Sequence, residues 1–214
     1  MIRHDCTVLA FSKAPVPGTV KTRLLPALNE NEAARLYREL VVRTLDTVTD
    51  SRIAGWRVQL WCTPVTDHPF FVECRDKYGV ELQLQARGDL GVRMHAAIAA
   101  AMTESDSVLL IGCDCPELQL ADLVKARQEL RLDADVVLGP SEDGGYYLIG
   151  MKTPQALLFQ DIPWGGPTVL DVTRGRLRGR GLRSYELPLR WDLDDMVDLQ
   201  RYRQMQERLG GADM

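Results

Sequence analysis

The sequence lacks a long hydrophobic run. No apolar stretch approaches the roughly 20 residues that a helix needs to cross a bilayer. The first residues lead into a short strand pattern that ends at Lys13, rather than into the hydrophobic segment of a signal peptide. We therefore expect a cytoplasmic protein with no membrane partner. The formal net charge is only -4, so no overall attraction draws nucleic acid to the chain, and none is expected as a partner.

Cysteine and histidine are too scattered to suggest a disulfide framework or a zinc cage. The five cysteines are an odd number, spread over apparent strands and turns. Cys113 and Cys115 flank Asp114, but no second Cys/His pair stands at ligand spacing and the three histidines are isolated. We expect these cysteines to behave as small buried hydrophobic residues.

Glycine-rich cofactor motifs and linkers are absent as well. Lys21 lacks the neighbouring glycines of a Walker A loop, and no G-x-G-x-x-G follows the first predicted strand, which argues against a dinucleotide cofactor. We find no internal repeat or low-complexity tract. The chain of 214 residues is 45% hydrophobic and 26% charged, and we interpret it as a single domain, 1–214, with a frayed tail at 209–214.

Strand and helix patterns alternate along most of the chain, which predicts an α/β fold with a mostly parallel sheet and helices on both faces. A small antiparallel part is expected toward the C-terminus, starting with the strand pattern at 143–150. Strands are predicted at 6–12, 58–62, 81–85, 108–111, 135–139, 143–150 and 183–187, and helices at 29–49, 69–78, 91–102, 120–130, 168–177 and after the acidic run at 192–198.

Asp114 is the first candidate functional residue. It follows an apolar run, 108–111, that has the pattern of a strand buried on both faces. Gly112 and Pro116 shape the turn that carries it. Ligands of open α/β sheets bind outside the carboxyl ends of strands, where a carboxylate can hold a metal ion on a bound phosphate. Capping of the following helix by Asp114 explains this segment equally well.

A basic loop follows the first predicted strand. Such a loop offers side-chain cations and backbone N–H groups to a phosphate. Its two prolines and its glycine fix the backbone, which favours phosphate binding over an ordinary solvated loop. The cations are Lys13, Lys21 and Arg23, and the shaping residues are Pro15, Pro17 and Gly18.

Two glycine-containing turns can bring the backbone close to a ligand. In the first, 85–94, Gly88 lies beside Asp89 and Arg93, which can bind the polar edges of a planar base; a helix junction capped by Asp89 is the plain alternative. In the second, 139–146, an acidic pair precedes two glycines, and a tight turn entering a strand explains it equally. Its candidate residues for an acceptor, together with Trp164, are Glu142, Asp143, Gly144, Gly145 and Tyr146.

An acidic run closes the set of candidates. Asp192 and Asp194 point the same way if the run is extended, because side chains alternate along a strand. Capping of the last helix accounts for Asp195 and Asp198 but not for the earlier pair. Mg²⁺ usually takes one or two protein carboxylates, so Asp114 with Asp192 or Asp194 would suffice for a metal site.

These segments resemble the GT-A, nucleotide-diphospho-sugar transferase superfamily. The matching motifs are F-S-K-A-P-V-P-G-T-V-K-T-R-L at 11–24, Q-A-R-G-D-L-G-V-R-M at 85–94, G-C-D-C-P-E-L at 112–118, G-P-S-E-D-G-G-Y-Y-L-I-G at 139–150 and D-L-D-D-M-V-D-L at 192–199. In particular the chain is similar to a bacterial family labelled glycosyltransferases and linked with arsenosugar biosynthesis. Trp164-Gly-Gly-Pro departs from the pattern, which has Ser or Thr after the tryptophan and a small residue.

The resemblance implies a GT-A-like three-layer sandwich and a transferase that uses Mg²⁺ or Mn²⁺. It implies that Asp114 and either Asp192 or Asp194 bind the metal. Lys13, Lys21 and Arg23 would hold the donor phosphates and act in catalysis, with Asp143 as a candidate base. The residues implied around the nucleotide are Ser12, Lys13, Gly18, Lys21, Arg23, Gly88, Asp89, Arg93 and Asp114.

Three functions stay open. The family label implies glycosyl transfer from an NDP-sugar to a small-molecule acceptor. The basic K-T-R-L loop is also similar to that of guanylyltransferases acting on phospholactate and the molybdenum cofactor, which implies an NTP donor and pyrophosphate as the leaving group. Both reactions need cations where charge builds on the leaving phosphate. A nucleotide-binding module without turnover is the third alternative, and a homo-oligomer is compatible with all three.

Overall fold

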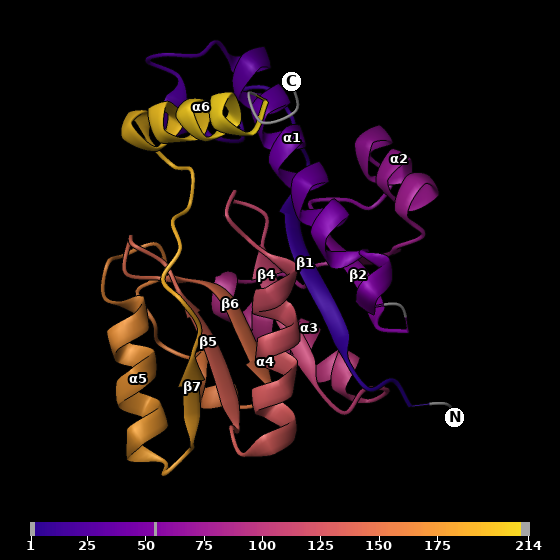
Figure 1. The fold of residues 1–214 in the computed structure, drawn as a ribbon, viewed down its shortest axis with the longest axis vertical. Helices are drawn as coiled ribbons and strands as arrows, with labels where there is room; N and C mark the ends of the chain where they lie inside the picture. Colours follow the sequence, from indigo (N-terminus) through magenta and orange to yellow (C-terminus); the bar gives the residue numbers. More distant parts are fainter. Residues whose placement is uncertain (1–2, 54, 211–214) are drawn as a thin grey trace.

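The computed structural model describes residues 3–53 and 55–210, and these build a seven-stranded sheet between two layers of helices (Figure 1). The strand order is β3-β2-β1-β4-β6-β5-β7. β6 is antiparallel to both β4 and β5, and the other neighbours are parallel. The strands are β1 (Thr7–Lys13), β2 (Arg57–Thr63), β3 (Glu81–Leu84), β4 (Val108–Gly112), β5 (Val136–Pro140), β6 (Tyr146–Met151) and β7 (Ser184–Glu186).

The helices confirm the predicted alternation. They are α1 (Glu30–Val48), α2 (Pro69–Tyr78), α3 (Leu90–Met102), α4 (Leu120–Leu132), α5 (Val169–Gly179) and α6 (Met196–Gly210), with 3-10 turns η1 (Thr22–Leu24), η2 (Ser51–Ile53) and η3 (Ala156–Leu158). α1 begins with a capping box, in which Asn29 and Glu32 each accept the other's backbone N–H. α6 includes Leu209 and Gly210, which we expected in the tail, and residues 211–214 lie outside the described part.

Side-chain alternation along β1 explains the two helical layers. Val8 and Ala10 face the core shared with α1, α2 and α4, whereas Leu9 faces the core shared with α3 and α5. β4 continues this pattern with Leu109 on the first side and Leu110 on the second. The central strands are therefore buried on both faces, and the α/β sandwich is confirmed.

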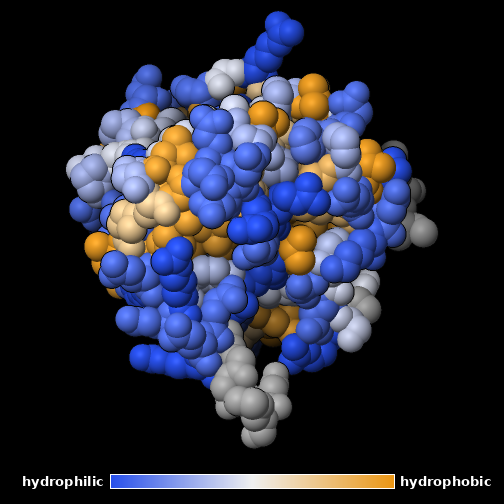
Figure 2. All heavy atoms as spheres, turned by 90° about the horizontal axis from the view of Figure 1, so that it is seen from above, coloured by the Kyte–Doolittle hydropathy of each residue, from blue (hydrophilic) through white to orange (hydrophobic). Residues whose placement is uncertain are grey.

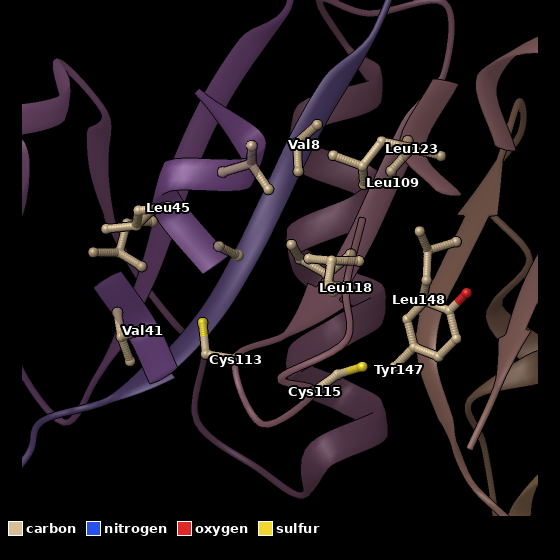
Figure 3. Close-up of a cluster of buried hydrophobic side chains, with 14 of the residues drawn as sticks. Val8, Val41, Leu45, Leu109, Cys113, Cys115, Leu118, Leu123, Tyr147 and Leu148 are labelled. Atoms are coloured by element: carbon tan, nitrogen blue, oxygen red, sulfur yellow. The ribbon is translucent and has the colours of Figure 1, made fainter. Parts of the chain in front are cut away.

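The cysteines that flank Asp114 are part of the first core. Figure 3 shows Cys113 on the side of Val41 and Cys115 on the side of Tyr147. All five cysteines are buried and free, and burial raises the pKa of both the Cys113 and the Cys115 thiol. These two side chains therefore pack as small hydrophobic groups.

The course of the chain creates a switch point between β1 and β4. From β1 the chain builds β2 and β3 on one side, and it then returns to place β4 on the other side of β1. Ligands bind at such a point, where the connections from neighbouring strand ends diverge. Above it, α6 crosses beside the loop that follows β1 (Figure 1), with Leu24, Leu193 and Leu199 in one cluster.

The upper face of the molecule is mostly hydrophilic, with hydrophobic residues in smaller groups between the polar ones (Figure 2). Among the described residues no helix is both long and apolar enough to span a bilayer.

Replacing Leu109 with Ala should lower the free energy of unfolding by about 2–5 kcal/mol, because it opens a cavity in a close-packed core. Leu109 is fully buried and a Cβ at Gly150 would meet its Cδ2 at 2.6 Å. Urea unfolding measures the change. Val124→Ala, on α4 and 45% exposed, is the control and should cost under about 1 kcal/mol; equal losses in both variants would contradict this view of the core.

Candidate active site

A cavity of about 380 Å³ opens at the carboxyl ends of β1 and β4, and a second hollow of about 310 Å³ adjoins it. The two share Lys13, Asp114, Asp143 and Gly165 as lining residues. The predicted cations and acids thus meet at the switch point of the sheet.

Asp114 is held at the rim of both hollows by its neighbours. The buried side chains of Cys113 and Cys115 anchor the turn, and the backbone N–H of Leu193 donates to Asp114 O over 2.9 Å. The N-cap of α4 is Gln119, so the alternative that Asp114 caps this helix is wrong.

Lys21 is the most confined of the cations. Its side chain is only 5% exposed, and its ammonium donates to Leu193 O over 2.6 Å and to Asp194 Oδ1 over 3.2 Å, while it also forms an ion pair with Asp114 Oδ1. Burial lowers the pKa of Lys21, but the charges of Asp114 and Asp194 outweigh burial and raise it above its ordinary value. Asp114 and Asp194 therefore converge on one positive charge.

Asp192 occupies a different position from Asp194. It lines the larger cavity and its Oδ2 accepts a hydrogen bond from the Ser141 hydroxyl over 2.8 Å. Burial raises the pKa of Asp192 to about 7, and the charge of Asp114 adds to the rise. Asp195 and Asp198 cap α6, as predicted: Asp195 Oδ1 accepts from Asp198 N, and Asp198 Oδ2 accepts from Asp195 N.

The loop after β1 places the remaining predicted phosphate ligands around the second hollow. Lys13 Nζ donates to Thr19 O over 2.8 Å, and the Arg23 guanidinium lies 3.8 Å from Asp194 Oδ2. The buried Tyr37 hydroxyl, which the sequence did not suggest, accepts the Lys13 backbone N–H and fixes the start of the loop. Gly18 has a φ of 76° and shapes the loop without lining either hollow.

The wall formed by β2, β3 and α3 carries Arg93. Gln85 is buried, donates to Trp61 O over 2.8 Å, and accepts from Arg93 Nη1 over 2.9 Å. Sequence reasoning did not single out Gln85, although a polar residue at the end of a predicted strand was a usable signal. Asp89 caps α3, as the plain alternative predicts, and neither Gly88 nor Asp89 lines the cavity, whereas Arg93 does.

A tight turn at 141–145 orients the acidic pair. Gly145 N donates to Asp143 Oδ1 over 2.9 Å, and Asp143 lines both hollows. Gly144 has a φ of 86°, and a Cβ there would meet Pro167 O at 2.0 Å, so this position requires glycine. Glu142 points away from the cavity and binds Arg201 on α6, so its predicted contact with an acceptor is not supported.

The two aromatic candidates for the acceptor, Tyr146 and Trp164, both line the larger cavity. Trp164 and Tyr146 meet edge to face, with ring centroids 6.4 Å apart. Trp191, in contrast, is buried in the cluster under α6, where Arg201 stacks on its ring. Leu90, Met94 and Val169 complete the apolar wall.

The oxygen atoms around Lys21 suit a divalent cation that takes only some of its ligands from the protein. Among residues 3–53 and 55–210, no three His, Cys, Asp or Glu side chains form a metal cluster. Asp114, Asp194 and the Leu193 carbonyl nevertheless direct oxygen atoms at the Lys21 ammonium, which acts as a stand-in cation. Mg²⁺ and Mn²⁺ prefer such hard ligands and take the rest from phosphate and water.

Replacing Asp192 with Asn should make stability less sensitive to pH. An unfolded Asp titrates near pH 3.9, whereas the folded pKa of Asp192 is about 7. The folded protein therefore binds the extra proton between these values, and its free energy of unfolding falls as pH rises from about 4 to 7. Asn keeps an acceptor for Ser141 and does not ionise.

We expect the variant to exceed the wild type by up to about 4 kcal/mol at about pH 8, and to match it near pH 4. Urea unfolding across this range with EDTA present measures the difference. Asp133→Asn, at an exposed carboxylate just after the C-terminal end of α4, is the control and should show a constant offset. A difference between Asp192→Asn and wild type that does not grow with pH would contradict the assignment.

Comparison with solved structures identifies the fold as one used by nucleotide-dependent transferases. The chain is similar to a provisionally assigned nucleotide-diphospho-sugar transferase from Desulfovibrio desulfuricans G20, with a TM-score of 0.82 and 31% identity over 92% of this chain and 85% of that one. Glucosyl-3-phosphoglycerate synthase from Mycobacterium tuberculosis, solved with Mn²⁺ and UDP, shares the fold at a TM-score of 0.57 and 12% identity, covering 92% and 75% of the two chains.

A nucleotidyltransferase shares the fold too. The 4-diphosphocytidyl-2C-methyl-D-erythritol synthase of Anaerococcus prevotii aligns at a TM-score of 0.59 and 11% identity, over 94% of this chain and 99% of that one. Among curated proteins no match was found, and nothing in these comparisons bears on arsenosugar biosynthesis. The profile of one family matches residues 44–166. The chain belongs to this family, DUF2064, which is described as an uncharacterized protein conserved in bacteria.

Proposed function

We propose that the chain is a divalent-cation-dependent transferase that moves a glycosyl group from an NDP-sugar to a small-molecule acceptor. The observation that carries this proposal is the convergence of Asp114 and Asp194 on the cation position beside Lys13 and Arg23. Carboxylates for a metal and cations for phosphates meet here at the switch point of the sheet, where ligands of this fold class bind.

Asp114 and Asp194 would hold Mg²⁺ or Mn²⁺, with the donor phosphates completing the shell. When bound, the metal neutralises charge on the phosphates and on the leaving nucleoside diphosphate. The glucosyltransferase that shares the fold contains Mn²⁺ and UDP. Asp192 lines the larger cavity and accepts a hydrogen bond from Ser141, so it is the less suitable second ligand.

Three cations of this chain would bind the donor phosphates. Lys13 lies at the junction of the two hollows, and Lys21 and Arg23 line the smaller one. They stabilise the negative charge that builds on the leaving phosphate, without any rearrangement of solvent. On the nucleoside side, Ser12 and Thr63 line the larger cavity, and Gln85 orients Arg93 toward it.

The inner end of the cavity would receive the acceptor. Its walls are apolar and aromatic, with Tyr146 and Trp164 in contact, and the side chains of Asp143 and Asp192 face it. The two cations that line the cavity, Lys13 at the end of β1 and Arg93 in the first turn of α3, are assigned above to the nucleotide. Carboxylates disfavour an anion, so the chemistry favours a hydroxyl on an uncharged, partly apolar acceptor, with Asp143 placed to accept its proton.

Nucleotidyl transfer is the second candidate, because nucleotidyltransferases share the fold. It would use the same metal and the same cations, with pyrophosphate as the leaving group. The greater similarity to an NDP-sugar transferase favours glycosyl transfer.

Asp114→Asn and Asp194→Asn should each weaken the Mg²⁺-dependent affinity for UDP or GDP at least about tenfold, because each removes one charged ligand of the cation. Isothermal titration with and without Mg²⁺ measures the effect, and circular dichroism checks the fold. Asp133→Asn serves as the control. Unchanged Mg²⁺ dependence in both site variants would remove the metal assignment.

A thermal-shift screen separates the two reactions. A ligand that binds only the folded state raises the melting temperature, and the rise grows with the ratio of its concentration to its dissociation constant. With Mg²⁺ or Mn²⁺ we expect larger shifts from NDP-sugars than from the matching NTPs, and slow release of sugar from one donor. Release of pyrophosphate from an NTP, with no shift by any NDP-sugar, would instead establish nucleotidyl transfer. Finding binding but neither reaction, with a range of alcohols as acceptors, would favour a non-catalytic nucleotide-binding module.

A further inference from the structure

We infer that Lys21 and the divalent cation exchange places: the ammonium joins Asp114 to Asp194 until the cation binds, and the cation then releases it toward the donor phosphates. The inference rests on the proposed function, since it needs a divalent cation on these two carboxylates.

The contacts of Lys21 leave it unable to bind a phosphate where it now lies. A lysine ammonium has three N–H donors. Here it faces three acceptors, namely the Leu193 carbonyl at 2.6 Å, Asp194 Oδ1 at 3.2 Å and Asp114 Oδ1. With 95% of the side chain covered, little room is left for a further partner.

A divalent cation would need the oxygen atoms that Lys21 uses. The ammonium is bound by Oδ1 of Asp114 and Oδ1 of Asp194, the two carboxylates that converge. Two cations held by the same oxygens would repel each other strongly in a partly buried site. Entry of the metal therefore requires the ammonium to leave.

The released side chain has a defined place to go. Lys21 lines the same hollow as Lys13, Thr22 and Arg23, which the donor phosphates would enter. Its backbone has a φ of 49°, a conformation uncommon for a residue other than glycine, and the 3-10 turn η1 begins at the next residue. The loop thus holds its Cα in place, and the exchange is a movement of the side chain.

Lys13 differs from Lys21 in its contacts. It lines the same hollow, but its Nζ donates to the Thr19 carbonyl, and among the described residues it forms no ion pair with a carboxylate. Lys13 is therefore ready for a phosphate before the metal binds, whereas Lys21 is not.

The exchange couples the metal to the nucleotide. A cation that binds alone must break the three contacts of Lys21, which weakens its affinity. With a nucleotide present, the phosphates give the freed ammonium new acceptors. Each ligand should therefore strengthen the other, by the same factor in both directions.

Titration of Mn²⁺ without nucleotide tests the inference, with the free ion followed by electron paramagnetic resonance. Lys21→Met keeps most of the side-chain volume and removes the charge, and we expect it to bind Mn²⁺ about tenfold more tightly than the wild type. Lys13→Met is the matched control and should stay within about twofold of the wild type. In the presence of UDP or GDP, the mutual strengthening of Mn²⁺ and nucleotide binding should shrink in Lys21→Met.

A second measurement uses the wild-type protein and needs no variant. Acetic anhydride in limiting amount modifies accessible lysines, and mass spectrometry gives the rate at each site. Lys21 should react slowly without Mn²⁺ and several-fold faster with Mn²⁺ alone, while the rate at Lys13 changes little.

The outcomes separate the inference from the proposed function. Unchanged or weaker Mn²⁺ binding by Lys21→Met, or a Lys21 acylation rate that Mn²⁺ does not alter, overturns the exchange and leaves the transferase proposal standing. If neither the wild type nor either variant binds Mn²⁺, even with nucleotide present, both the metal site and the exchange are contradicted.

Discussion

The segment 190–194 lies across the carboxyl ends of β4 and β5, and its backbone hydrogen bonds create the candidate site. Arg190 N donates to Pro140 O over 3.1 Å, and Leu193 N donates to Asp114 O over 2.9 Å. Through these bonds two carboxylates from opposite parts of the chain, on Asp114 and Asp194, reach the same ammonium. Without the segment, Asp114 would have no second carboxylate opposite it at the Lys21 ammonium.

A buried ion pair fixes the position of this segment. Asp122 is 3% exposed and Arg190 14%, and their side chains are 3.0 Å apart. The other oxygen of Asp122 accepts the backbone N–H of Gln119 and caps α4. Such a pair adds little net stability, because both charges lose water, but removal of one partner leaves a buried charge uncompensated. The pair therefore acts mainly by holding 190–194 in register with the turn that carries Asp114.

Local patterns predicted the fold well because each depends on neighbouring residues. The capping box of Asn29, the strand at Val108–Gly112 and the helix at Pro69–Tyr78 all follow from spacing and burial within a few positions. The contacts of Lys21 are different in kind. Lys21 and Leu193 are 172 positions apart, and Lys21 has a left-handed backbone, which no residue pattern predicts for a lysine. Likewise Glu142 and Asp143 are adjacent and both acidic, and only the turn at 141–145 decides which one faces the cavity.

The charge of the site supports the proposal that a metal takes part in nucleotide binding. The chain has a net charge of -4, and three acids line the same cavity as Lys13, namely Asp114, Asp143 and Asp192. A nucleoside diphosphate would meet these acids as well as the cations, and the acids would repel its phosphates unless they were neutralised. The raised pKa of Asp192, about 7, removes part of one charge near neutral pH. The single charge of Lys21 offsets one of the two charges on Asp114 and Asp194, and in that position the ammonium does not contact the phosphates. A divalent cation on those two carboxylates would change the charge around the phosphates in two ways: it would add its own charge, and in the proposed exchange it would free the charge of Lys21 for the phosphates.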